Sequence, residues 1–98
     1  PMNDNVVEYA VKLVSKTRPT SAHAPEIVKN FLDWGAGPRA SQNLVLGAKA
    51  YAAIQGKFSP DIADVQAVAP GILHHRIVKN YKAEAEGIKE KELIMALF

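Results

Sequence analysis

The chain has 98 residues, of which 48% are hydrophobic and 22% are charged, a balance typical of one small globular domain rather than a disordered segment. Its net charge is only +2, and no block of like charge occurs along it, which argues against nucleic-acid binding because that requires clustered cations. It has no cysteine, which excludes disulfides and thiolate metal sites. It also has no apolar run near the ~18 residues of a membrane span and no signal-peptide pattern. We therefore expect a cytoplasmic protein without a membrane span.

Helical periodicity predicts two helices in the first third of the chain. Asp4 is a suitable N-cap, and apolar residues then recur at three- and four-residue spacings over about Val6–Thr17. The pair Arg18-Pro19 ends this helix, because the residue before a proline disfavours helical geometry. After a connector, Pro25 suits the first position of a short helix over Glu26–Asp33.

The longest predicted helix extends over about Arg39–Gln55 and is apolar on nearly every side, which is typical of a helix at the centre of its domain. Gly56 is a suitable residue just after its end. Ser59-Pro60-Asp61 then provides an N-cap, a first position and an acidic first turn for a helix that reaches about Val68. We expect Pro70-Gly71 to break or kink the chain after it.

The last part of the chain is less clearly patterned. Residues 76–87 fit a helix extension or a loop, and Ile88–Leu97 is expected to form a final helix. No convincing alternating strand and no repeat is found. The pattern predicts an all-α fold, a small four- to five-helix bundle. The sparse aromatic side chains are expected in its core or at its boundary: Phe31, Trp34, Tyr51, Phe58 and Tyr81.

The run WGAGPRAS, residues 34–41, places a cation in the first turn of the longest helix. Gly37 suits the N-cap and Pro38 the first helical position, so that Arg39 follows directly. A helix start already carries partial positive charge, and a cation there is favourable when both face an anion such as the terminal phosphate of a nucleotide. Gly35 and Gly37 permit close approach of a ligand or of another backbone. The alternative is that Arg39 simply points into solvent.

These residues also carry a family resemblance. Three segments together resemble the C-terminal lid of MoxR-type AAA+ ATPases: Trp34–Ala50, Asp64–Val78 and Ala83–Ile88. The resemblance covers most of the chain from Val6 onward. It implies that Arg39 is the sensor 2 arginine, which reaches the γ-phosphate of ATP and is the catalytic residue of the lid. The nucleotide-binding positions that it implies are Gly35, Gly37, Pro38 and Arg39.

The parts that would complete an ATPase are missing from the sequence. Gly47 and Gly56-Lys57 have the wrong spacing for a phosphate loop, and no acidic pair follows an apolar strand to hold magnesium. We therefore expect ATP and Mg²⁺ to be bound mainly by an absent N-terminal core, and no cofactor or metal by this chain alone. Residues 1–98 are expected to be one lid domain of a longer protein, as the Pro1-Met2 start and the apolar end also suggest.

The resemblance further implies what the longer protein does. It would be an ATPase that acts as a chaperone-like factor and assembles or activates partner complexes. The partners implied are its own AAA+ core, neighbouring subunits of a ring and a protein with a von Willebrand factor A domain, without nucleic acid.

Other patterns have competing interpretations. His74-His75 invites a metal site, but adjacent helical positions diverge by about 100° and a packed, capping or exposed role fits better. The segment around GKFS has the proportions of a helix-turn-helix nucleic-acid module, although Asp61 and Asp64 lie where base-reading residues should be. A plain helical interaction module is a further alternative. Trp34 would pack at the hinge between lid and core or against the adenine.

Overall fold

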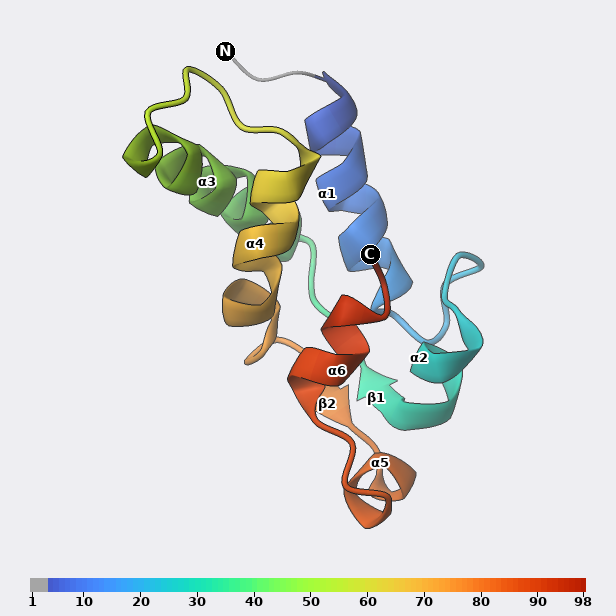
Figure 1. The fold of residues 1–98 in the computed structure, drawn as a ribbon. Coiled ribbons are helices and arrows are strands. Elements are labelled where there is room, and N and C mark those ends of the chain that lie inside the picture. The colour runs from blue at the N-terminus through green and yellow to red at the C-terminus, as the bar shows by residue number, and fades with distance from the viewer. Residues whose placement is uncertain (1–3) are drawn as a thin grey trace.

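A computed structural model describes residues 4–98, which form six helices and one antiparallel pair of short strands (Figure 1). The elements in chain order are α1 (Asp4–Lys16), α2 (Glu26–Phe31), β1 (Leu32–Trp34), α3 (Arg39–Ile54), α4 (Ile62–Leu73), β2 (Val78–Lys79), α5 (Tyr81–Ala85) and α6 (Glu90–Met95). The all-α class is confirmed. The prediction that no strand is present was wrong, because strands of three and two residues are too short to produce a visible alternation.

The helices divide between the two ends of an elongated molecule (Figure 1). At one end α3 contacts α1 and α4, while α6 packs on α4 nearer the middle. At the other end, α2 lies beside α5, and the β1–β2 pair lies between these helices and α6 (Figure 1). The strands pair Leu32 with Lys79 and Trp34 with Val78, with an irregular register between them. None of the helices formed by residues 4–98 has the length and apolarity needed to cross a membrane.

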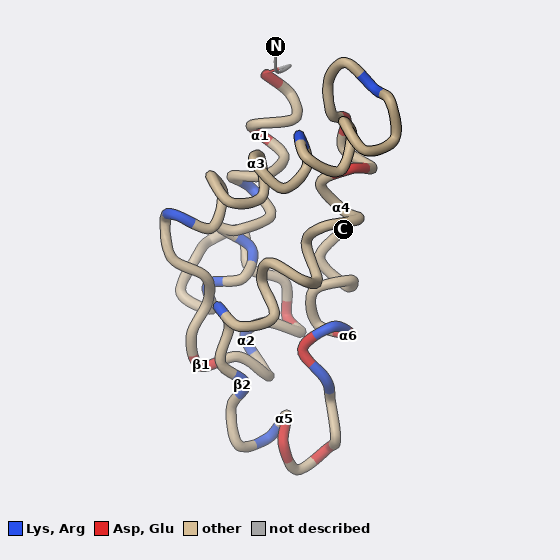
Figure 2. The backbone as a smooth tube through the Cα atoms, turned by 90° about the vertical axis from the view of Figure 1, so that its left-hand side faces the viewer, with Lys and Arg blue, Asp and Glu red and all other residues tan. Residues whose placement is uncertain are grey.

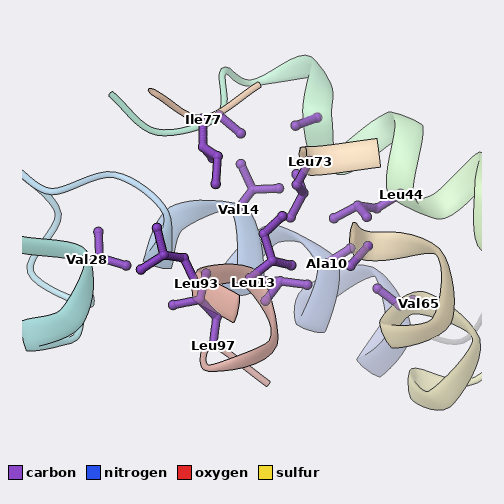
Figure 3. Close-up of a cluster of buried hydrophobic side chains, with 14 of the residues drawn as sticks. Ala10, Leu13, Val14, Val28, Leu44, Val65, Leu73, Ile77, Leu93 and Leu97 are labelled. Atoms are coloured by element: carbon purple, nitrogen blue, oxygen red, sulfur yellow. The ribbon is translucent and has the colours of Figure 1, made fainter. Parts of the chain in front are cut away.

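Aliphatic side chains and alanines build the core, which joins α1, α3, α4 and α6 (Figure 3). The expectation that the aromatic residues lie in the core or at its boundary holds for Phe31, which packs against the core, and was wrong for Trp34, Phe58 and Tyr81, which are exposed. Helices α3 and α4 pack closely, since a Cβ on Gly47 would lie 2.6 Å from Cδ1 of Ile72. The largest fully buried side chains include Leu13, Leu44, Leu73, Leu93 and Ile94.

Helix α3 occupies the range predicted for it and ends as predicted. Gly56 has φ = 81°, its N–H donates to the Ala53 carbonyl at 3.0 Å, and the Lys57 N–H donates to the Ala52 carbonyl at 2.9 Å. These two bonds form a Schellman motif, which satisfies carbonyls left free at the helix end. Although α3 is apolar on nearly every side, only the face formed by Ala40, Leu44, Ala48 and Ala52 is buried, while Leu46 and Ile54 are exposed.

Helix α4 begins later and ends later than predicted. Asp61, not Ser59, is its N-cap: the Asp61 carboxylate accepts from the Asp64 N–H, and the Asp64 carboxylate accepts from the Asp61 N–H. Pro70 and Gly71 do not break the helix, which continues to Leu73. Proline removes a single donor, while burial of Ala69 and Leu73 favours continuation of the helix through this turn.

Smaller differences occur at the other helix ends. Asp4 lies within the first turn of α1 and not at its cap. Pro25 has an extended backbone (φ −71°, ψ 164°) and precedes α2, which ends at Phe31 because the chain then enters β1. Within residues 76–87, the carboxamide oxygen of Asn80 caps α5 by accepting from the Ala83 N–H at 2.9 Å.

Asp64 is a buried carboxylate on which a pH test of stability can be based. It is 2% exposed, accepts a 2.9 Å hydrogen bond from the Asp61 N–H, and lies 3.1 Å from the Lys57 ammonium. The Asp61 N–H first, and Lys57 second, lower the pKa of Asp64 in the folded chain. The stabilisation is therefore complete above the ordinary aspartate pKa of about 3.9 and is lost as pH falls through the lower, folded pKa.

We accordingly expect Asp64→Asn to reduce the loss of stability on acidification, besides destabilising the chain at pH 7. Urea midpoints measured between pH 7 and pH 2 for both proteins would show a shallower acid limb in the variant. Glu8→Gln, at an exposed position of α1, is the matched control. If the urea midpoint falls with decreasing pH equally steeply in the wild type and in Asp64→Asn, Asp64 is not a source of the acid sensitivity.

Candidate functional site

The predicted site residues lie at the start of α3. Pro38 has helical dihedrals (φ −60°, ψ −30°) immediately before the helix, and the Ala40 N–H donates to the Gly37 carbonyl at 3.1 Å. Pro38 is therefore the N-cap residue, one position later than the Gly37 predicted, although its own dihedrals are helical, as predicted. Arg39 is exposed in the first turn.

Arg39 lines a hollow of about 470 Å³ at this end of α3. The hollow also includes Arg76, a residue from the segment between α4 and β2 that sequence reasoning did not assign to any site. Two arginines from distant parts of the sequence thus meet on one surface. The residues that line the hollow are Gly37, Pro38, Arg39, Ala40 and Arg76.

The hollow has an excess of positive charge. In residues 4–98, the ion pairs involve Lys57 and Lys79 and include neither Arg39 nor Arg76. The Arg76 guanidinium donates through Nη1 to the Ile72 carbonyl at 3.2 Å, a contact that leaves its charge uncompensated. A guanidinium offers five N–H donors that match the oxygens of a phosphate or carboxylate. The arrangement therefore suits an anionic ligand.

Gly35 packs tightly against the backbone just after α1. A Cβ at this position would lie 2.5 Å from the Thr17 carbonyl carbon and 2.6 Å from Cα of Arg18, both backbone atoms that cannot move aside easily. Gly35 also lies outside the hollow that contains Arg39, whereas a Cβ on Gly37 would meet nothing within 4 Å. Close approach of another backbone is thus observed at Gly35, and its contact with a nucleotide stays a prediction.

Two residues that sequence reasoning missed hold the segment before α3 in place. The Thr17 hydroxyl donates to the Val14 carbonyl at 2.6 Å and accepts from the Ala36 N–H at 2.9 Å. The Arg18 Nε–H donates to the Ala36 carbonyl at 2.9 Å. Both backbone groups of buried Ala36 are thus bound by the end of α1, which fixes where α3 can begin. The sequence gives little signal for these roles, because Arg18-Pro19 indicates only the end of a helix and Thr17 only its last residue.

A second hollow of about 420 Å³ adjoins the first at Gly37. Trp34, 70% exposed, contributes to it from β1. Its position on the surface is compatible with either predicted role, at a hinge or against a base, and both stay predictions. The residues that line it are Arg18, Pro19, Thr20, Asp33, Trp34, Gly35, Ala36 and Gly37.

The other candidate motifs do not gather into a site. His74 and His75 are exposed, with their Nδ1 atoms 3.4 Å apart, and among residues 4–98 no three His, Asp or Glu side chains lie close enough together to hold a metal. Lys57 pairs with Asp64 at a helix end and is not in a phosphate loop. Figure 2 shows Lys and Arg positions distributed along the chain, interleaved with acidic ones around α5 and α6.

Comparison with known proteins gives one consistent set of matches. A family model described as the AAA lid domain matches residues 24–96. The chain is 34% identical over 89 residues to Chaperone MoxR1 of Mycobacterium tuberculosis, covering 91% of this chain and 24% of that protein. It is 32% identical over 92 residues to the uncharacterized protein YeaC of Bacillus subtilis, covering 94% of this chain and 26% of that protein.

A solved structure agrees with these matches. The crystal structure of a candidate ATPase from Cytophaga hutchinsonii superposes with a TM-score of 0.89 at 34% identity, covering 98% of this chain and 29% of that one. The chain thus spans about a quarter of the length of the proteins that it matches.

Proposed function

Because the chain belongs to the AAA lid domain family, as a lid of the MoxR type, we propose that it closes over ATP bound by a core domain of the same protein and presents Arg39 to the γ-phosphate. In this proposal residues 1–98 are the C-terminal lid domain. The phosphate loop and the groups that hold Mg²⁺ would belong to the core, and this chain would contribute the cationic hollow at the start of α3.

The observation that carries the proposal is an exposed arginine without an ion-pair partner in residues 4–98, held in a hollow at the start of α3. During ATP hydrolysis, a water oxygen bonds to the γ-phosphorus as the bond from that phosphorus to the β,γ-bridging oxygen breaks. Negative charge is then spread over the phosphoryl oxygens. The Arg39 guanidinium would donate hydrogen bonds to these oxygens, and exclusion of water by the closed lid would strengthen them.

The activity of the whole protein is part of the same proposal. It would be an AAA+ ATPase that uses lid movement to act on partner complexes, a role that takes support from the chaperone description of the relative in Mycobacterium tuberculosis. A ring of subunits, a von Willebrand factor A domain partner, the absence of nucleic acid and a cytoplasmic location remain predictions.

The structure does not support the alternative of a helix-turn-helix nucleic-acid-binding module. Asp61 caps α4 and Asp64 is buried in the following turn beside Lys57, so negative charge occupies the start of the would-be recognition helix. We therefore retain a single candidate function.

Amide hydrogen exchange in the full-length protein would test closure of the lid. A hydrolysis-resistant ATP analogue with Mg²⁺ should slow exchange in the segment 37–41 relative to the nucleotide-free protein, because the phosphate and core would cover the start of α3. The α3–α4 loop around Gly56–Phe58 is exposed and serves as an internal control. Equal exchange of segment 37–41 with and without the analogue would contradict the proposal.

A further inference from the structure

We infer that Arg76 is a second residue that contacts the terminal phosphate, acting together with Arg39. The inference rests on the proposed function and extends it. It starts from the hollow described above, in which Arg39 from the start of α3 and Arg76 from beyond the end of α4 line the same surface.

The local structure fixes the backbone of Arg76 on both sides. Its N–H donates to the Leu73 carbonyl at 2.9 Å, which closes the turn after α4. The next residue, Ile77, is buried in the core, and Val78 pairs with Trp34 in the small sheet. The guanidinium is thus carried by a backbone that is held in place before any ligand arrives, which reduces the entropy lost on binding.

Electrostatics favours a shared anion between the two arginines. Like charges on one surface repel each other, and residues 4–98 supply no ion-pair partner to either guanidinium. An anion placed between them removes this repulsion and gains charge-assisted hydrogen bonds from both sides. A γ-phosphate has three terminal oxygens, so it can accept from Arg39 and Arg76 at the same time.

A purely structural role for Arg76 is the competing explanation. A cation after the C-terminus of α4 is favourable, and its Nη1 already donates to the Ile72 carbonyl. That bond uses one of five donors and leaves the remaining N–H groups available to a ligand. The two roles differ in outcome: a structural residue affects stability, whereas a phosphate contact affects the preference for ATP over ADP.

The test measures nucleotide affinity in the full-length protein. Arg76→Gln should weaken binding of a hydrolysis-resistant ATP analogue about tenfold, which corresponds to ~1.4 kcal/mol. Its affinity for ADP should stay within about twofold of the wild type, because ADP lacks the γ-phosphate. Lys49→Gln removes one exposed charge from α3 outside the hollow and should change neither affinity. Arg76→Lys should recover part of the loss, because it restores charge without the bidentate geometry.

The outcomes separate this inference from the proposed function. If Arg39→Gln weakens binding of the ATP analogue and Arg76→Gln does not, the inference is overturned and the proposed function stands. If neither variant discriminates between ATP analogue and ADP, the inference is overturned, and the proposed function is then decided by the effect of Arg39→Ala on kcat. Equal weakening of both nucleotides by Arg76→Gln, with a lower melting temperature, would assign Arg76 a structural role alone and overturn the inference.

Discussion

Replacing Arg39 by alanine in the full-length protein is expected to slow ATP hydrolysis roughly 100-fold at saturating ATP, the order of loss seen when one donor to a transition-state oxyanion is removed. The reason is that Arg39 would act on charge that grows during phosphoryl transfer, so its loss should lower kcat and not only raise KM. The lid should remain folded, because the Arg39 side chain is exposed and forms no ion pair within residues 4–98.

Steady-state hydrolysis over a range of ATP concentrations would give kcat and KM separately. Lys49→Ala is the matched control, since it removes an exposed cation from the same helix at a site outside the hollow. Thermal unfolding of the 98-residue chain should show Arg39→Ala within about 3 °C of the wild type, as expected for a surface change. An unchanged kcat would remove Arg39 from the proposed function, whatever the effect on KM.

Gly35→Ala is expected to destabilise the chain by about 2–3 kcal/mol, which lowers the melting temperature by roughly 10–20 °C. The added methyl group would overlap the backbone of Thr17 and Arg18. Relief of that overlap requires separating the end of α1 from the segment before α3, which strains or breaks the hydrogen bonds that Thr17 and Arg18 make to Ala36. Circular dichroism against temperature would measure the loss.

Gly37→Ala, two residues away in the same motif, is the matched control. Its Cβ would meet no atom within 4 Å, and its φ is not positive, so we expect a change in stability below about 0.5 kcal/mol. If both glycine variants unfold at the same temperature as the wild type, Gly35 has no packing role. If both are equally destabilised, the close approach at Gly35 does not explain its effect.

The motif around Arg39 shows where prediction from sequence succeeds. Pro38 restricts its own φ and lacks an N–H, and Gly56 tolerates positive φ, so the start and end of α3 follow from properties of single residues. Asp61 shows the limit of such rules. Both Ser59 and Asp61 are suitable caps by residue type, and the reciprocal bond with Asp64 and the contact with Lys57 selected Asp61.

The role of a residue in the site was harder to predict than its helix position. Gly35 and Gly37 look alike in sequence, yet a Cβ on Gly35 would clash with the backbone after α1, whereas a Cβ on Gly37 would meet nothing within 4 Å. Arg76 carried no distinguishing pattern, since its partner in the hollow is 37 positions earlier in the chain. The role of Thr17 could not be predicted, because residue type alone does not distinguish a buried hydroxyl with two hydrogen-bond partners from an exposed one.

By itself the sequence determined the helical class, the bounds of α3 and the presence of a cation in its first turn, because these depend on interactions between residues close in the chain. Only the tertiary structure decided which aromatic residues stay outside the core, which glycine is required for packing and which second arginine shares the hollow with Arg39. The role of Gly35 depends on the close packing of the segment before α3 against the end of α1, and the shared hollow depends on the packing of α3 against α4. Such contacts join residues far apart in the chain, and no local pattern encodes them.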